Sequence, residues 1–177
     1  MSEPESQLLN ARLQKLERLR SKGIDPYPHS YKRSHTSREA ASLFESVEAQ
    51  QGSGARTDSV SVAGRLVAVR RMGKITFTDL QDGSGRIQAL LRRSELDDSY
   101  EILKDLDLGD WLGVSGPLFR TRSGEISIDV AKYSVLSKSL RPLPEKGHGL
   151  VDMEIRFRQR YLDLIVNEEA RRVAVVR

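Results

Sequence analysis

The chain has 177 residues, a formal net charge of +4 and no cysteine. This length suits one domain with appendages, and the lack of cysteine excludes a disulfide framework and a cysteine zinc site. The start of the chain is acidic and polar, unlike a signal peptide, and no apolar run approaches the length of a membrane span. We therefore expect a cytoplasmic protein with no membrane partner.

The first predicted element is a helix over residues 5–22. A proline-containing, extended stretch separates it from a second helix over residues 34–51. Either Ser34 or Thr36 would cap this second helix. Residues 1–56 are therefore expected to form an N-terminal helical arm.

One face of the first helix is basic. Its members recur at spacings of three, three and four residues: Arg12, Lys15, Arg18 and Lys22. Arg12 and Lys15 are candidates for contacts with phosphate groups, although such a row is more often a solvated face.

Five strand-like runs follow, with a helical stretch between the third and the fourth. The runs are 59–70, 75–81, 86–91, 110–121 and 125–136, and the helical stretch is 94–106. This order is the signature of an oligonucleotide-binding (OB) fold. We expect an α+β, mainly β chain. Its centre would be a five-stranded OB-fold Greek-key barrel over residues 57–137, with N-terminal helices, a helix between strands three and four, and a C-terminal helical segment.

The second and third strands are expected to form a hairpin around Asp82-Gly83-Ser84-Gly85. A two-residue and a four-residue loop give the same pairing, in which Asp79 faces Gln88. Phe77 and Gln88 then become diagonal neighbours on the outer face. A base could stack on the ring while the amide bonds its edge, and such stacking is worth about 1–3 kcal/mol per base.

The alternative for this hairpin is a register slipped by one residue, which would turn Phe77 into the core. In an OB fold, strands two and three carry the binding face, and this favours the outward orientation of Phe77. Charge points the same way. Residues 57–93 hold seven basic and three acidic side chains, whereas residues 94–110 hold seven acidic ones and only Lys104. A polyanion would be drawn to the first three strands and repelled from the next segment.

The last two strands are expected to meet at a tight turn. Ser123-Gly124 would pair Arg122 with Glu125, which turns Phe119 towards the core and Glu125 outward. The Glu125 carboxylate could then accept a hydrogen bond from a base. The alternative is a surface ion pair between Glu125 and Arg122, worth about 0–1 kcal/mol.

The end of the chain changes character. Residues 138–149 are expected to form a linker, and residues 150–177 look helical but are apolar on more than one side. A helix of that kind needs burial, so we expect residues 150–177 to begin a further domain of a longer protein.

Four stretches closely resemble the family of bacterial class II lysyl-tRNA synthetases. They are K-L-E-R-L-R-S-K-G-I-D-P-Y-P (15–28), V-A-G-R-L-V-A-V-R-R-M-G-K-I-T-F-T-D-L-Q-D-G-S-G-R-I-Q (62–88), L-G-D-W-L-G-V-S-G-P-L-F-R-T-R-S-G-E-I-S-I (108–128) and the run from R-P-L-P to D-L-I-V-N (141–167). The resemblance spans nearly the whole chain, in order.

This resemblance implies that the barrel binds the uridine-rich anticodon of lysine tRNA. Phe77 would stack on the middle base with Gln88 beside it. Arg70 and Glu125 would contact bases or the neighbouring backbone. Further candidates for phosphate contacts, besides the two on the first helix, are Arg71, Lys74 and Arg86.

The resemblance also implies that the intact enzyme is a homodimer that uses ATP and magnesium to activate lysine and transfer it to tRNA. Its catalytic motifs are not found in these 177 residues, so we assign no catalytic residue and no metal ligand, and expect the chain alone to be inactive. Two other functions stay open: a sequence-tolerant binder of single-stranded nucleic acid, and a docking or dimer-forming role suggested by the apolar C-terminal segment.

Overall fold

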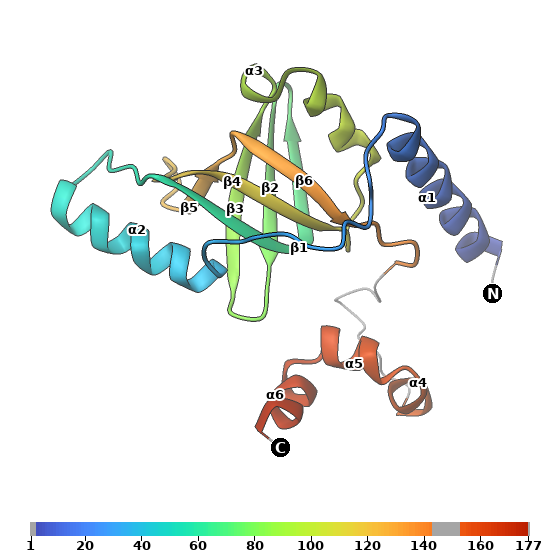
Figure 1. Cartoon of the computed structure of the whole chain (residues 1–177). Helices are drawn as coiled ribbons and strands as arrows, with labels where there is room; N and C mark the ends of the chain where they lie inside the picture. Colours follow the sequence, from blue (N-terminus) through green and yellow to red (C-terminus); the bar gives the residue numbers. More distant parts are fainter. Residues whose placement is uncertain (1–2, 143–152, 177) are drawn as a thin grey trace. The chain divides into compact units, whose positions relative to one another are not determined.

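The computed structural model describes residues 3–142 and 153–176, and the chain divides into two compact units, Met1–Arg141 and Pro142–Arg177. The first unit contains the helices α1 (Glu3–Ser21) and α2 (Ser37–Gln51) and a six-stranded sheet (Figure 1). Within the two described ranges, no helix is long and apolar enough to cross a membrane.

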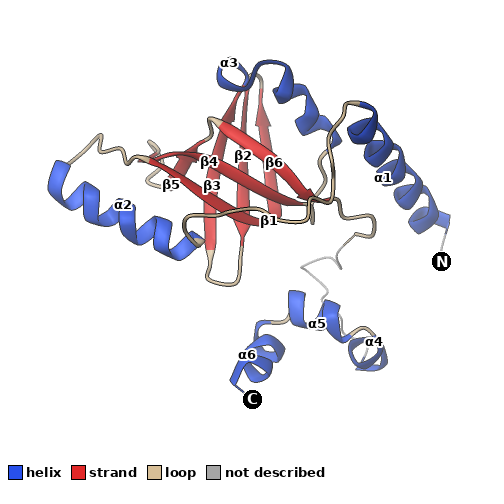
Figure 2. Ribbon diagram, in the orientation of Figure 1, coloured by secondary structure: helices blue, strands red, loops and turns tan. Residues whose placement is uncertain are grey.

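The sheet closes into a barrel (Figure 2). Its strands are β1 (Ser59–Met72), β2 (Ile75–Gln81), β3 (Arg86–Arg92), β4 (Trp111–Arg120), β5 (Ile126–Asp129) and β6 (Lys132–Ser137). They follow the order β1-β2-β3-β5-β4-β6, and β1 also pairs with β4. Only the β3–β5 pairing is parallel. This arrangement confirms the predicted OB fold.

The single last strand predicted over 125–136 is in fact two strands, β5 and β6. The break lies opposite Gly116 of β4, where the chain approaches very closely: a Cβ at Gly116 would lie 1.9 Å from the backbone oxygen of Asp129. Across the break, the Ala131 amide still donates to the Ser115 carbonyl at 2.9 Å. The strand therefore bends over β4 at a position that only glycine can occupy without a shift of the backbone.

The register predicted for the last hairpin is wrong by one residue. β4 pairs Phe119 with Ser127 and Leu118 with Ile128, so the fully buried Leu118 faces the core and Phe119 does not. The cause is the loop, which spans three residues, Arg122 to Gly124, with Gly124 at φ +90°. The Thr121 amide closes it by donating to the Glu125 carbonyl at 2.9 Å.

The helical stretch between strands three and four is confirmed, but it has two parts. They are α3 (Arg93–Leu96) and the 3₁₀ helix η1 (Asp97–Asp105), and Asp97, where η1 begins, has a φ of +44°. The stretch closes one end of the barrel because Leu96 and Leu103 are buried in the core. The Tyr133 hydroxyl fixes it to the sheet by donating to the Ser99 carbonyl at 2.6 Å.

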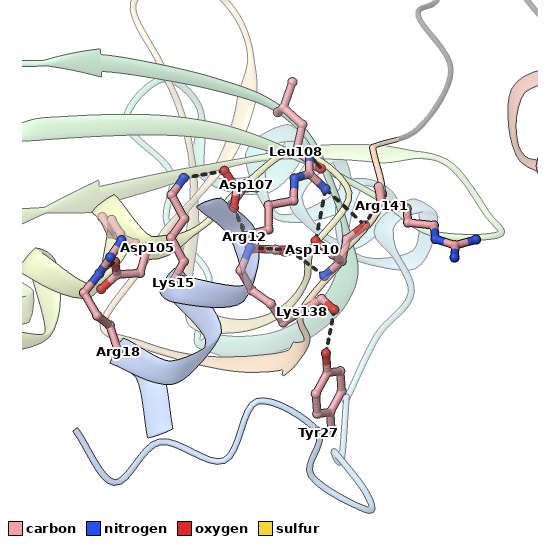
Figure 3. A network of polar contacts seen from close by, with 12 residues as sticks. Arg12, Lys15, Arg18, Tyr27, Asp105, Asp107, Leu108, Asp110, Lys138 and Arg141 are labelled. Atoms are coloured by element: carbon pink, nitrogen blue, oxygen red, sulfur yellow. Dashed lines mark hydrogen bonds and ion pairs between the residues drawn. The ribbon is translucent and has the colours of Figure 1, made fainter. Parts of the chain in front are cut away.

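The basic row of α1 docks onto the end of η1 and the loop that follows it, as Figure 3 shows. Lys15 lies 2.5 Å from an oxygen of Asp107, and Arg18 lies 2.7 Å from Asp105. Arg12 is buried, with Nη1 donating to the Ser139 carbonyl at 3.0 Å. Arg12 and Lys15 are therefore engaged within the chain rather than free for the predicted phosphate contacts, whereas Arg18 and Lys22 stay largely exposed. Asp105 and Asp107 are therefore paired with basic side chains of the same chain.

The exit from the barrel is tied into the same network. Lys138 has no exposed side-chain surface, and its Nζ lies 2.6 Å from Asp107 and 3.0 Å from Asp110. Asp110 is equally buried and accepts a hydrogen bond from the Ser139 amide at 2.8 Å. The Tyr27 hydroxyl donates to the Lys138 carbonyl at 2.9 Å (Figure 3). The arm and the end of the last strand therefore share one buried set of charges.

Over residues 153–176, the described part of the second unit beyond Pro142, there are three short helices: α4 (Met153–Arg158), α5 (Arg160–Val166) and α6 (Glu168–Val176). Asp163 is fully buried among them and accepts from Arg156 Nε at 2.9 Å. Several large apolar side chains of these helices are exposed, and Phe157 is 70% exposed. Most of the predicted linker over residues 138–149 lies outside the described residues.

Candidate nucleic-acid interface

Phe77 lies on the outer face of the β2–β3 hairpin. The observed pairing of Asp79 with Gln88 is the predicted one, and it also sets Phe77 opposite Leu90. Thr76 and Thr78 on either side of Phe77 are buried, whereas the Phe77 ring is partly exposed. The slipped register is therefore wrong, and the ring is available to a ligand on this face.

A groove of about 440 Å³ lies next to this ring. It runs between α2 and the outer face of the barrel, and its lining residues are Ala41, Arg70, Asp79, Arg86, Ile87, Gln88, Arg120, Gly124, Glu125 and Ile126. Three of the four residues predicted to contact the anticodon are in this list. The fourth, Phe77, adjoins the groove because it pairs with Arg70 across β1 and β2.

Arg70 forms one wall of the groove. Its Nη2 lies 3.5 Å from Asp79 Oδ1, while the Arg70 side chain stays 57% exposed. This long ion pair orients the guanidinium without occupying most of its donors. Arg70 can therefore donate to an incoming base or phosphate, and the second oxygen of Asp79 can accept.

Gln88 forms the floor, and it is more deeply set than predicted. Gln88 is only 9% exposed, because β5 pairs with β3 on the side away from Asp79. The Ser127 hydroxyl, which is fully buried, donates to Gln88 Oε1 at 2.8 Å. The amide is thus held in place before any ligand arrives.

Arg120 ties the β4–β5 loop to α2 at the other wall. It donates to both carboxylate oxygens of Glu48, at 2.7 and 2.5 Å, and to the Gly124 carbonyl at 2.7 Å. These hydrogen bonds lower the pKa of Glu48 and raise that of Arg120. The guanidinium also stacks over Phe44, 5.5 Å from the ring centroid. Glu125, which follows Gly124 in the loop, is exposed at the mouth of the groove.

Asp82 ties the tip of the β2–β3 hairpin to the start of α2. Its carboxylate accepts from the backbone amides of Ser37 at 2.8 Å, Ser84 at 2.7 Å and Gly85 at 3.0 Å. Burial raises the pKa of Asp82, but a hydrogen bond from the Ser84 hydroxyl at 2.7 Å and these three from backbone amides outweigh it and leave the pKa below its ordinary value. Thr36 and Glu39 cap the same helix with a capping box, so of the two predicted caps Thr36 is the correct one. The groove is therefore built on a rigid base.

The candidate phosphate contacts on the barrel are all exposed. Arg86 lines the groove, and Lys74 lies at the turn between β1 and β2. Arg71 donates to the Leu103 carbonyl at 3.0 Å through one nitrogen, which leaves its other donors to solvent. Arg86 therefore faces the groove, whereas Arg71 lies on the opposite face of β1 from Arg70 and points towards η1.

Sequence reasoning missed several residues that shape the groove: Asp79, Ser127, Arg120, Glu48 and Ala41. Asp79 was within reach, because the hairpin register already placed it beside Phe77 on the outer face. The others depend on contacts between distant parts of the chain. Glu48 and Arg120, for example, are separated by 72 residues.

Together these side chains offer a flat ring, donors from Arg70 and Gln88, and acceptors from Asp79 and Glu125. That set fits the face and edge of an unpaired base. Among the residues that the structure describes, there is no cluster of His, Cys, Asp or Glu able to hold a metal ion.

Comparison with known proteins agrees with this geometry. Residues 60–136 match the tRNA anticodon family of OB-fold nucleic acid binding domains. The chain is 51% identical over 175 residues to a lysine–tRNA ligase of Dehalococcoides mccartyi. The aligned region covers 98% of this chain and 35% of that protein. A lysine–tRNA ligase of Carboxydothermus hydrogenoformans is 44% identical over 97% of this chain and 34% of its own length. Lysine–tRNA ligase 2 of Methanosarcina mazei is 48% identical over 95% of this chain and 32% of its own length. The chain thus spans about a third of the length of these relatives.

Proposed function

Because residues 60–136 belong to the tRNA anticodon family of OB-fold nucleic acid binding domains, we propose that this chain binds the anticodon loop of lysine tRNA. The tRNA identity is supported by relatives that share 44–51% of their residues with nearly the whole chain and are named lysine–tRNA ligase. The observation that carries the proposal is the groove of Arg70, Gln88 and Glu125 beside the outward Phe77 ring.

In this proposal the middle anticodon base stacks on Phe77. Gln88 and Arg70 donate to the edge of that base, and Glu125 at the mouth of the groove accepts from a neighbouring base. Arg86 lines the groove, and we expect it to neutralise phosphates of the loop together with Lys74 at the β1–β2 turn and Arg71. Stacking supplies affinity for any base, and the polar groups select among bases.

The activity of a longer protein of the same kind is also a proposal. A chain as long as the relatives would attach lysine to lysine tRNA through a lysyl-adenylate, with ATP and magnesium, as a cytoplasmic homodimer. The described part of this chain would serve that reaction by holding the anticodon, and residues 150–177 would begin the catalytic domain.

Binding of RNA hairpins tests the proposal. The chain would be titrated with a lysine-tRNA anticodon stem-loop and with a stem-loop whose loop sequence is scrambled, at one stated salt concentration. Preferential binding of the lysine loop is the expected result. Equal affinity would instead favour the sequence-tolerant single-strand binder, and tight binding of neither would favour a docking role.

A further inference from the structure

Ser127 lies under the floor of the groove, in hydrogen-bonding contact with Gln88. It belongs to the short strand β5 and has no exposed surface. The parallel pairing of β3 and β5 sets it directly beside Gln88. A serine in this position on a strand could be replaced by alanine without loss of apolar packing, so its hydroxyl needs an explanation.

The Ser127 hydroxyl can donate one hydrogen bond, and the distances to its two possible acceptors indicate which of them receives it. Ser127 Oγ lies 2.8 Å from Gln88 Oε1, whereas its other acceptor, the Glu125 carbonyl, is 3.5 Å away. The short contact is a good hydrogen bond, and the long one is marginal. Donation to Gln88 therefore satisfies the amide oxygen from below.

This bond decides which end of the amide faces the groove. With Oε1 held by Ser127, Gln88 Nε2 makes no hydrogen bond to any residue that the structure describes, and it is not a buried atom lacking a partner. Gln88 lines the groove, so its N–H donors are presented there. A reversed amide would place Nε2 against Ser127 Oγ and leave the hydroxyl proton only the distant Glu125 carbonyl.

We propose that Ser127 is a positioning residue that sets base specificity, because it fixes Gln88 as a hydrogen-bond donor towards the ligand. This inference rests on the proposed function and names the chemistry that the site selects. The donor fits a base with a carbonyl oxygen at ring position 4, as in uracil. Cytosine carries an amino group at that position, and its N–H donors would face those of Gln88.

The neighbours of Gln88 agree with this selection. Arg70, on the adjoining wall, adds a second set of donors that suits the other carbonyl of the same uracil ring. Asp79, opposite Gln88, supplies an acceptor for the ring N–H of uracil. Cytosine has an unprotonated ring nitrogen at that point, which would face a carboxylate.

The test uses the whole chain and two stem-loops that differ only in a uracil or a cytosine at the middle anticodon position. For the parent chain the affinity ratio is expected to be about 5–150-fold in favour of uracil, the range of one good edge contact. Ser127→Ala removes the hydroxyl and frees the amide to present either end. The ratio should then fall to within about threefold, mostly through better binding of the cytosine loop. Ser127→Thr, which restores the hydroxyl, should recover the ratio.

A second variant keeps the inference testable if Ser127→Ala folds poorly. Gln88→Glu still accepts the Ser127 hydrogen bond but presents an acceptor to the groove, so its preference should move from uracil towards cytosine. A folded Ser127→Ala chain with the parent ratio, or one that loses both loops equally, overturns the role of Ser127. Failure of the proposed function is distinct from either result, because the parent chain itself would then not separate lysine and scrambled loops.

Discussion

Arg120 and Glu48 share two hydrogen bonds of 2.7 and 2.5 Å that join the β4–β5 loop to α2. The same guanidinium holds the Gly124 carbonyl, one residue before Glu125. A helix of the arm thereby sets the position of a loop on the barrel. The groove is consequently a joint product of both parts of the first unit.

Glu48→Ala tests that dependence. Without its partner, Arg120 should release the loop, and affinity for the anticodon stem-loop should fall severalfold with little loss of stability. Fluorescence anisotropy measures the first quantity and thermal melting the second. Glu45→Ala is the matched control, because it removes the same charge from an exposed position on α2. Equal effects of the two substitutions would show that only net charge matters.

Lys138→Met tests the buried charges at the barrel exit. The substitution would leave the fully buried Asp110 carboxyl without its counterion, and removing one partner of a buried ion pair costs about 3–5 kcal/mol of unfolding free energy. Urea denaturation measures this loss. Lys132→Met, at an exposed position on β6, should change the stability by less than about 0.5 kcal/mol. A loss at Lys138 no larger than at Lys132 would contradict the network.

Stability should fall in acid through the aspartates that dock the arm. Burial raises the pKa of Asp105 and of Asp107, but hydrogen bonds and ion pairs with basic partners outweigh it, and both pKa values lie below the ordinary 3.8. As the pH falls, these two carboxylates therefore take up protons at a higher pH in the unfolded chain than in the folded one. The stability that they contribute is present above pH 3.8 and is lost as the pH falls through their folded pKa values.

Urea denaturation across pH checks this sign. The contribution of Asp105 and Asp107 to the unfolding free energy should be constant between about pH 7 and pH 5 and should decline below about pH 4. Asp105→Asn should show a shallower decline, whereas Asp58→Asn, at an exposed position, should follow the parent. A parent curve that rises in acid would contradict the assignment.

Gly116→Ala tests the bend between β5 and β6. The added Cβ would meet the Asp129 carbonyl at 1.9 Å, so the two strands must separate. We expect a loss of about 1–3 kcal/mol, the usual cost of overpacking. Gly83→Ala is the control, since a Cβ there has no atom within 4 Å. Equal melting temperatures for the two variants would show that the backbone yields at no cost.

The two hairpins show what a sequence can and cannot predict. The first register was predictable because both plausible loop lengths around Asp82 give the same pairing. The second was not, because a loop of three residues rather than two shifts every pair. That choice depends on Gly124 at positive φ and on the Thr121–Glu125 closure, which short-range patterns do not distinguish.

The basic row of α1 teaches a related lesson. Its spacing was visible in the sequence, but its partners Asp105 and Asp107 lie about ninety residues away along the chain. Charge alone could not tell a phosphate-binding face from an internal docking face. Within the groove, likewise, Phe77 and Gln88 were accessible to reasoning on one hairpin, whereas Ser127 required the parallel β3–β5 pairing.

The most direct test of the account is the affinity of Phe77→Ala for the lysine-tRNA anticodon stem-loop at a fixed salt concentration. Phe157→Ala is the control, because that ring is 70% exposed in the second unit. The account predicts that Phe77→Ala weakens binding by about 1–3 kcal/mol, the value of one stacked base, with the fold intact. A folded Phe77→Ala chain that binds as tightly as the parent and the Phe157→Ala control would show that the outer face of the hairpin is not where the anticodon binds.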